Sequence, residues 1–559
     1  MFFCENCGTP LHKGDRFCEE CGTPVASNAP VDNKPYGALQ DNLFFCENCG
    51  APLHKGDRFC EECGNPVAGN GASDALQDNL FKNSMWRTKW QTAVREAKKN
   101  GEATGIILIN THSCACSLKI GMTLSDYILC KRKQGISYYC LDLATEAVCQ
   151  TCGDSAIESV MKVLHTIYDV AAPDYLLIVG DTASVGAKKW ESHVDKDPFV
   201  CSDLPYWTMD LESPWEGKTY DFDNAVLTGR IPCSAATGFA EACYYFENYM
   251  KLERPADHVV SFGLSAFAWK EVSEDIYREL GDGLLLSPEL TVEQFHHVSL
   301  AKLNGGKEPN LLYFNLHGSD MENYWYGQRN EAYPRAFSVV GLPQRNGYVI
   351  GTEACYGAIQ CDQNAQPKSI LLEAMKNGCL AFVGSDTMAY GGVRRDKQCY
   401  ADDIISRFLR GVKEGECFGY ALREARKELQ NSACPSDIAI KTNAQFALYG
   451  DPSSCLVCSK AHRVYVPQRE CTRIYVPIPD IRAAVRVSMI KVSIQIEMIL
   501  SQYIEKYHSD FSGIQPQHYK NQSDDLMQAM YTKHNGSFIQ TLKLYYDQHG
   551  KVCHECISR

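Results

Sequence analysis

Between residues 104 and 458, short apolar runs alternate with amphipathic stretches of helix length along the chain. The apolar runs have the length of buried strands and cover residues 105–109, 175–179, 259–264, 311–316, 348–350 and 379–383. The amphipathic stretches cover residues 155–170, 239–250, 292–303, 369–376, 403–414 and 419–429. Continuous apolar runs are typical of parallel strands that are covered on both faces. The alternation therefore predicts an α/β fold with a largely parallel sheet and helices on both of its faces.

The pattern changes after Cys458. Two similar segments, 463–467 (RVYVP) and 473–477 (RIYVP), predict a small hairpin. Partial alternation over 485–496 predicts one or two strands, and residues 497–507 have the pattern of a helix. We expect residues 459–559 to form a small C-terminal α+β appendage.

The chain begins with an internal repeat, because residues 2–25 recur almost unchanged at 44–67. Each copy holds two Cys-x2-Cys pairs that are separated by ten residues. Four thiolates at this spacing suit tetrahedral Zn²⁺, and a segment this short cannot bury a sufficient core without a metal. The predicted ligands of the two structural zinc ions are Cys4, Cys7, Cys18, Cys21, Cys46, Cys49, Cys60 and Cys63. We therefore expect zinc ribbons at 1–25 and 44–67, a linker at 26–43, and a linker with lead-in at 68–103.

Length and charge narrow the partners of this chain. It has 559 residues, a 45% hydrophobic composition and a formal net charge of −13, which indicate a globular protein of more than one domain without a surface for nucleic acid or anionic membrane. Residues 1–80 hold five basic and twelve acidic side chains, a balance of 5 − 12 = −7. Many zinc ribbons bind nucleic acid, but a phosphate-binding surface needs the opposite sign. We expect these ribbons to contact a protein substrate or a regulatory protein.

The 28 cysteines indicate a compartment and further metal sites. Neither a signal-peptide pattern after Met1 nor an apolar run of about 18 residues is present, so paired thiols predict metal ligands in a reducing cytoplasm. One possible further zinc set is Cys455, Cys458, Cys553 and Cys556. Another is Cys114, Cys116, Cys149 and Cys152. For both sets the alternative is buried free thiols.

Two of the apolar runs end at a reactive side chain that is flanked by glycine. These segments are 312–318 (LYFNLHG), which ends at His317-Gly318, and 348–357 (YVIGTEACYG), which contains Cys355. Because a parallel sheet delivers the ends of its strands to one edge, the two runs predict a thiol–imidazole pair. The imidazole activates or orients around a nucleophilic thiolate, and glycine lets backbone amides approach a developing oxyanion.

This arrangement resembles the caspase–gingipain clan of cysteine peptidases. Further segments recur in gingipain-like enzymes in the same order: 174–181 (DYLLIVGD), 202–203 (SD), 227–232 (LTGRIP) and 448–453 (LYGDPS). The resemblance covers about residues 104–460 and implies a parallel-sheet sandwich with a first α/β subdomain at 104–256 and a catalytic one at 257–458. It implies an endopeptidase that forms an acyl thioester on Cys355, with His317 protonating the leaving amine. The backbone amides of Gly318 and Cys355 would bind the oxyanion, and catalysis would need no cofactor.

The substrate pocket departs from that family. Arg-specific gingipains carry a carboxylate after the strand that corresponds to 259–264, and an Asp on this loop meets the guanidinium. Here residues 265–270 read SAFAWK, which places Trp269 at the position of that Asp, so a third catalytic acid and strict Arg specificity are not carried over. We expect Trp269, Asp386 and Tyr390 to line the pocket, with Asp386 able to receive a cationic side chain. A solvated loop carboxylate is the alternative for Asp386.

Two hypotheses for the whole chain remain. The first is an intracellular cysteine endopeptidase whose zinc ribbons recognise substrates or regulate it. The second is a catalytically inactive scaffold of gingipain fold that binds proteins through its ribbons. The missing acid favours the scaffold, whereas the intact His-Gly and Ala-Cys segments favour the peptidase.

Overall fold

The computed structural model describes residues 85–111, 117–146, 154–216, 219–234, 237–252, 254–359, 369–395, 398–432, 436–457, 487–521 and 526–559, together with four two-residue strands nearer the N-terminus. The chain divides into two compact units, 1–80 and 81–559. In the first unit, β1 (Phe2–Phe3) pairs with β2 (Pro10–Leu11), and β3 (Phe44–Phe45) pairs with β4 (Pro52–Leu53), both antiparallel. The two copies of the repeat therefore form the same hairpin.

A ten-stranded sheet is the centre of the second unit, with the strand order β12-β11-β13-β16-β17-β19-β10-β7-β5-β6. Its strands are β5 (Ala103–Ile109), β6 (Ile136–Asp142), β7 (Tyr175–Val179), β10 (Leu227–Ile231), β11 (Ser261–Ala266), β12 (Leu285–Ser287), β13 (Leu311–Asn315), β16 (Tyr348–Thr352), β17 (Cys379–Ser385) and β19 (Phe446–Gly450). Strands β6, β5, β7 and β10 form one parallel group, and β12, β11, β13, β16 and β17 form another. Strand β19 joins the two groups and is antiparallel to β17. The predicted α/β fold with a mostly parallel sheet is confirmed.

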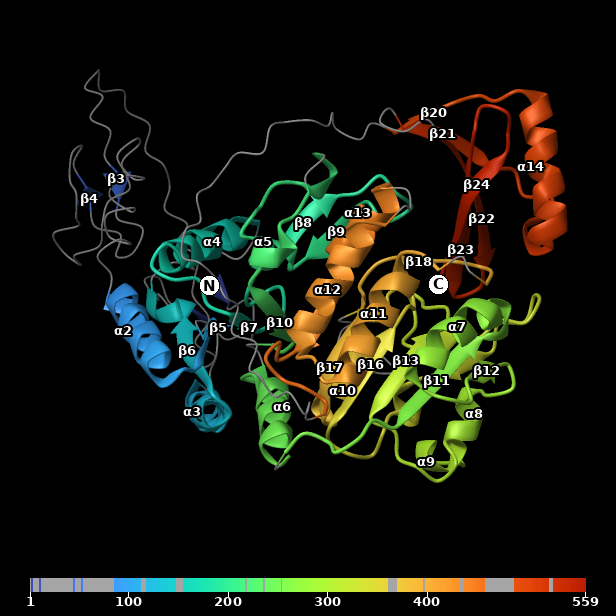
Figure 1. Cartoon of the computed structure of the whole chain (residues 1–559). Coiled ribbons are helices and arrows are strands. Elements are labelled where there is room, and N and C mark those ends of the chain that lie inside the picture. The colour runs from blue at the N-terminus through green and yellow to red at the C-terminus, as the bar shows by residue number, and fades with distance from the viewer. Residues whose placement is uncertain are drawn as a thin grey trace, which may run out of the picture. The chain divides into compact units, whose positions relative to one another are not determined.

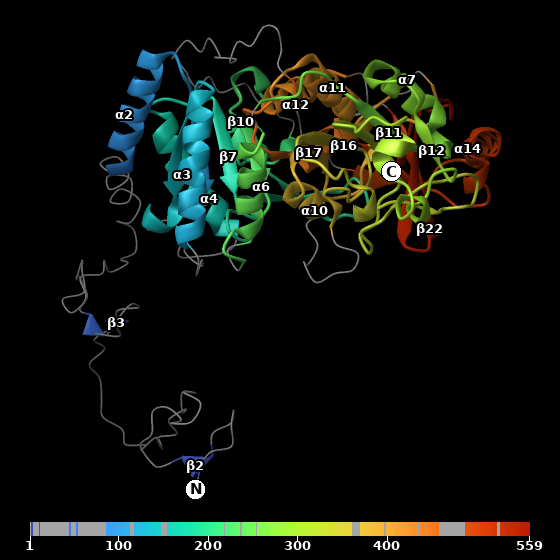
Figure 2. The ribbon, with the colours of Figure 1, turned by 90° about the horizontal axis from the view of Figure 1, so that it is seen from below.

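Helices cover both faces of this sheet (Figures 1 and 2). In β5, Ile106 and Leu108 pack with α2 (Met85–Asn100) and α4 (Asp154–Tyr168). The alternate residues of the same strand belong to the other core cluster, with α3 (Ser117–Lys133) and α6 (Ala240–Met250). In the second group, α7 (Lys270–Leu280), α11 (Ala401–Glu414) and α12 (Phe418–Gln430) lie on one face, and α10 (Ile370–Lys376) lies on the other (Figure 2). Burial of both faces explains why the strands read as continuous apolar runs.

Smaller elements connect these layers. They are β8 (Lys188–Glu191), β9 (Phe199–Ser202), α5 (Leu204–Thr208), α8 (Val292–Phe295), α9 (Leu300–Leu303), β14 (Trp325–Tyr326), β15 (Arg335–Phe337), β18 (Tyr390–Gly391) and α13 (Ser436–Gln445). Among the described residues, the helices include none with the length and apolar character that crossing a membrane requires.

The C-terminal part forms an antiparallel sheet of six strands in the order β18-β24-β23-β22-β21-β20 (Figure 1). Its elements are β20 (Val487–Met489), α14 (Ile494–Tyr507), β21 (Gln517–Asn521), β22 (Met527–Asn535), β23 (Phe538–Tyr546) and β24 (Val552–Ser558). The strand and helix predicted over 485–507 correspond to β20 and α14, whereas the predicted hairpin at 463–477 lies outside the described residues. Strand β18 follows β17 of the central sheet, so the C-terminal sheet is docked on the central one by backbone pairing.

Candidate active site

The sheet register brings His317 and Cys355 to one level. Phe314 of β13 pairs with Thr352 of β16, and each reactive residue follows its paired residue by three positions. The exposed fraction of the side chain is 0% for His317 and 1% for Cys355, so both lie inside the protein. A Cβ added at Gly318 would lie 1.6 Å from the carbonyl oxygen of Cys355. Only glycine permits this approach of the two loops.

The Cys355 thiol is held by the turn that follows β17. The backbone amide of Ala389 donates to Sγ over 3.2 Å, and the thiol lies 3.4 Å from the Ala389 carbonyl oxygen, which accepts from it. Burial raises the pKa of Cys355 to about 12, against smaller lowering effects of the Ala389 amide and Lys441. The thiol is therefore protonated at neutral pH in this closed arrangement.

A neutral amide fixes the tautomer of His317. The Nε2 atom lies 2.8 Å from Oε1 of Gln328, while Nε2 of Gln328 donates to the Asn330 carbonyl oxygen over 3.3 Å. Since that amide presents its oxygen to the ring, the imidazole must carry its proton on Nε2. The Nδ1 atom is then a free base, and it has no hydrogen-bond partner among the described residues. Burial lowers the pKa of His317 to about 3, so the ring is neutral.

Arg559 occupies the place where a substrate carbonyl would bind. Its main-chain carbonyl oxygen accepts hydrogen bonds from the amides of Gly318 and Cys355, at 3.4 and 3.3 Å. Its own amide donates to the Ala389 carbonyl oxygen over 3.0 Å. These two donors are the amides that the sequence analysis assigned to the oxyanion.

The residues predicted for the substrate pocket have different positions. Trp269 lies with its ring 4.3 Å from the Arg559 guanidinium carbon, and Tyr390 pairs with Ser558 in the sheet. Asp386 is buried, burial raises its pKa to about 7, and the basic group that acts on it is Lys441. The described residues that meet the Arg559 guanidinium instead carry the carboxylates of Asp402 and Glu353.

Sequence reasoning missed these two carboxylates as well as Gln328. Glu353 stands two residues before Cys355 and offered the one local signal, because alternate residues share a face at the end of a strand. Asp402 lies in the first turn of α11, and Gln328 follows the short strand β14. Their positions depend on the fold rather than on the local pattern.

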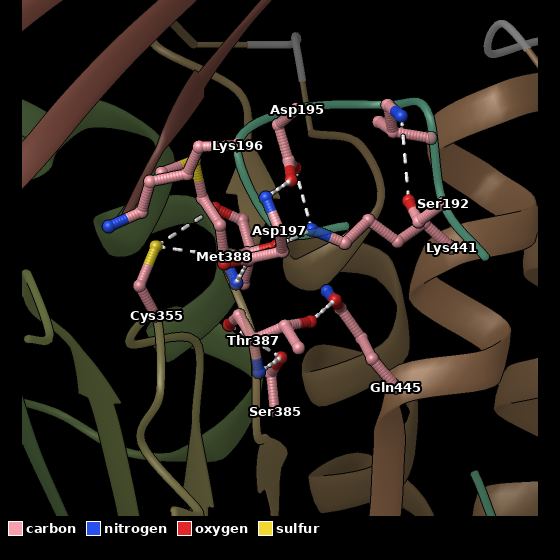
Figure 3. A network of polar contacts seen from close by, with 12 residues as sticks. Ser192, Asp195, Lys196, Asp197, Cys355, Ser385, Thr387, Met388, Lys441 and Gln445 are labelled. Atoms are coloured by element: carbon pink, nitrogen blue, oxygen red, sulfur yellow. Dashed lines mark hydrogen bonds and ion pairs between the residues drawn. The ribbon is translucent and has the colours of Figure 1, made fainter. Parts of the chain in front are cut away.

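A polar network ties the first parallel group to the turn at Cys355 (Figure 3). Asp197, between β8 and β9, accepts from the Met388 amide over 2.7 Å and from the Tyr356 hydroxyl over 2.6 Å. The Lys441 ammonium lies 2.6 Å from Asp195, 3.4 Å from Asp197 and 3.0 Å from the Met388 carbonyl oxygen. These contacts fix residue 388, and through it the neighbouring residue that touches the thiol.

The predicted zinc ligands are only partly described. The eight ribbon cysteines Cys4, Cys7, Cys18, Cys21, Cys46, Cys49, Cys60 and Cys63 lie outside the described residues, as does Cys458. Within the described part, no group of three or more His, Cys, Asp or Glu side chains could hold a metal, so Cys455, Cys553 and Cys556 are not brought together. Cys553 is exposed and Cys556 is buried, because residues three apart on strand β24 point to opposite faces.

Comparison with known proteins gives one family. The double zinc ribbon family matches residues 4–64. The chain carries a double zinc ribbon. The match implies structural zinc binding in this segment, in agreement with its eight paired thiols.

No curated protein matches the sequence. Among solved structures, one described as "Structure of Protease" is similar at 11% identity and a TM-score of 0.41, over 82% of this chain and 90% of that one. The separase–securin complex of Saccharomyces cerevisiae is similar at 12% identity and a TM-score of 0.28, over 50% of this chain and 15% of that one.

Proposed function

We propose that this protein is a cysteine endopeptidase of the gingipain-like kind that hydrolyses peptide bonds through an acyl thioester on Cys355. The observation that carries the proposal is the position of the Arg559 carbonyl oxygen, which accepts from the amides of Gly318 and Cys355. A peptide carbonyl held by two converging amides, one of them that of the nucleophile itself, is bound as a substrate is bound for acyl transfer.

The reaction follows from these positions. Sγ of Cys355, as thiolate, attacks the carbonyl carbon, and the negative charge that develops on the oxygen is stabilised by the two amides. The C–N bond then breaks, and the leaving amine takes a proton from the imidazole of His317. Water hydrolyses the thioester, which releases the carboxylic acid and restores the thiol. The free base Nδ1 of His317 suits this proton exchange, because Nε2 is held by Gln328.

The proton distribution depends on burial of the site. Burial keeps both Cys355 and His317 neutral, since it raises the pKa of the thiol and lowers that of the imidazole. Admission of solvent or a polar substrate reverses both shifts and favours the thiolate–imidazolium pair. The neutral pair is the observation that favours the rival function, a scaffold that binds a peptide segment without cleaving it.

A peptide library separates these two functions. We expect the full chain to cleave a proteome-derived library at defined positions, and a peptidyl chloromethyl ketone to form a thioether with Cys355. Mass spectrometry identifies both the new peptide ends and the modified cysteine. A chain that cleaves no peptide and that the ketone does not modify at Cys355 would be a scaffold.

We propose that the double zinc ribbon holds two Zn²⁺ ions and recruits a protein substrate or a regulatory protein. Its acidic balance opposes nucleic acid, and a tethered module raises the local concentration of what it binds. Since zinc-bound thiols persist in a reducing compartment, we propose the cytoplasm as the location.

Deletion of residues 1–80 should remove both zinc ions and leave cleavage of short peptides unchanged. The reason is that residues 81–559 form a separate compact unit that contains His317, Cys355 and both amides. Elemental analysis and peptide kinetics measure the two effects. In the full chain, Cys4→Ser combined with Cys7→Ser should remove one zinc ion of two. Zinc retained after the deletion, or a large loss of peptide cleavage, would contradict this expectation.

A further inference from the structure

The guanidinium of Arg559 fills a closed polar pocket beside the candidate active site. Nη2 lies 2.6 Å from Oδ1 of Asp402 and donates to the Gly392 carbonyl oxygen over 2.7 Å. Nε lies 3.4 Å from Oε2 of Glu353, and the plane of the group faces the ring of Trp269. The side chains of Arg559, Asp402 and Glu353 are fully buried. The pocket is therefore built around one cation.

The two carboxylates are held in place without help from the arginine. Oδ2 of Asp402 accepts from the amides of Gly392 and Cys399, at 2.5 and 3.0 Å. Oε1 of Glu353 accepts from the Tyr313 hydroxyl over 2.8 Å. Each acid thus leaves its second oxygen for the ligand. Two buried carboxylates so close together are costly without a cation, which makes an empty or neutral occupant unfavourable.

The geometry favours arginine over lysine. A guanidinium presents donors along one edge to two acids while its flat face packs on an aromatic ring, whereas an ammonium is a point charge that cannot make both contacts at once. The wall at Gly391 is close as well, since a Cβ there would lie 2.2 Å from Nη2 of Arg559.

The backbone that leads to Arg559 has the conformation of a bound peptide. Ser558 pairs with Tyr390 and Ile557 with Gly391, both antiparallel, so β24 adds a strand to β18. Strand addition of this kind is a common way to hold an extended peptide by its main chain. Together with the Arg559 amide on the Ala389 carbonyl oxygen, the pairing aligns the carbonyl of Arg559 with the two oxyanion amides.

The rest of the C-terminal sheet covers the imidazole. The ring of Phe538 stacks on His317 with the centroids 4.6 Å apart, and the Ser319 hydroxyl donates to the Ser537 carbonyl oxygen. Lys543 donates to the Val194 carbonyl oxygen, and Arg394 pairs with Glu555 at 2.7 Å. Substrate cannot reach the thiol while β24 and Phe538 keep these positions.

We propose that β24 is a built-in ligand of the acyl side of the active site, and that the pocket of Asp402, Glu353 and Trp269 selects arginine as the residue before the cleaved bond. The inference rests on the proposed function and gives its substrate class. Segments with arginine in an extended stretch are the substrates that can replace β24.

An extended chain tests both parts of this inference. We expect a reporter peptide joined to Arg559 to be released, leaving a product whose mass ends at Arg559. The same chain with Arg559→Lys should release it about tenfold more slowly, and Arg559→Gln about a hundredfold more slowly, since an unpaired buried carboxylate is left behind. Cys355→Ala in the extended chain should release none. Equal release with Arg, Lys and Gln at position 559 would overturn the pocket assignment and keep the peptidase.

Alkylation of Cys355 by iodoacetamide gives a readout that needs no peptidase activity. In the chain without a reporter, Arg559→Gln should raise the alkylation rate about tenfold or more, because the thiol becomes accessible and ionises more readily. Lys551→Gln, at an exposed position before β24, is the matched control and should leave the rate unchanged. Equal rates in all three chains would overturn β24 as the ligand. Arg559-dependent alkylation without any reporter release would instead reject the peptidase and retain the ligand pocket.

Discussion

Cys355→Ala is expected to lower peptide cleavage by about a thousandfold or more while the protein stays folded, because the substitution removes the nucleophile and only a small thiol. The loss should appear in kcat rather than in KM, since Arg559 and its pocket show that a peptide can be held by contacts that do not involve the sulfur. Peptide kinetics at saturating substrate measure this change, and circular dichroism reports whether the fold is kept.

Cys379→Ala is the matched control for this experiment. Cys379 is likewise buried, on the neighbouring strand β17, so its loss removes the same volume without touching the site. It should leave kcat unchanged. His317→Ala should be nearly as inactive as Cys355→Ala, and the double variant scarcely worse, because groups that act as one unit are not additive. Full activity in Cys355→Ala would end the assignment of the nucleophile.

Lys441→Met is expected to lower the free energy of unfolding by about 3–5 kcal/mol, the usual effect of removing one partner of a buried ion pair. The Lys441 side chain is fully buried, and Asp195 is 1% exposed, so the substitution leaves a carboxylate without its counter-charge inside the protein. Urea unfolding of the two proteins measures the difference. Activity should fall as well, because the same lysine holds the Met388 carbonyl beside the thiol turn.

Lys270→Met serves as the matched surface control. Lys270 and Glu274 form an ion pair at 3.6 Å with side chains that are 44% and 37% exposed. Exposed pairs of this kind contribute about 0–1 kcal/mol, so the control should change stability little. A Lys441→Met protein as stable as the control would show that the network in Figure 3 does not hold this part of the site.

The sequence predicts what depends on local pattern. Continuous apolar runs predict β13 and β16, and the glycine after each reactive residue predicts a tight approach of two strand ends. The repeated Cys-x2-Cys pairs predict the zinc ribbons, and the family match at residues 4–64 confirms that interpretation. Spacing alone carries this information, because a strand edge or a metal site needs few long-range contacts to be recognised.

The rest of the site depends on segments that are far apart in the chain. Arg559 meets Asp402 across 157 positions, and Lys441 meets Asp195 across 246. The alternation in the last hundred residues predicts strands, but it says nothing about the edge on which one of them pairs. A polar residue such as Gln328 carries no local mark of its task, because its orienting role arises only when the chain brings it against an imidazole.

Strand β19 imposes an order on how this protein can be made. It lies between β17 and β10, yet it follows both in the chain. While the ribosome is still adding α11, α12 and α13, the first parallel group therefore ends in an open edge at β10, and so does the second at β17. Open edges of apolar strands pair readily with other chains. A nascent chain that stalls before residue 446 is a candidate for chaperone capture or aggregation, and residues 104–256 expressed alone should share that fate.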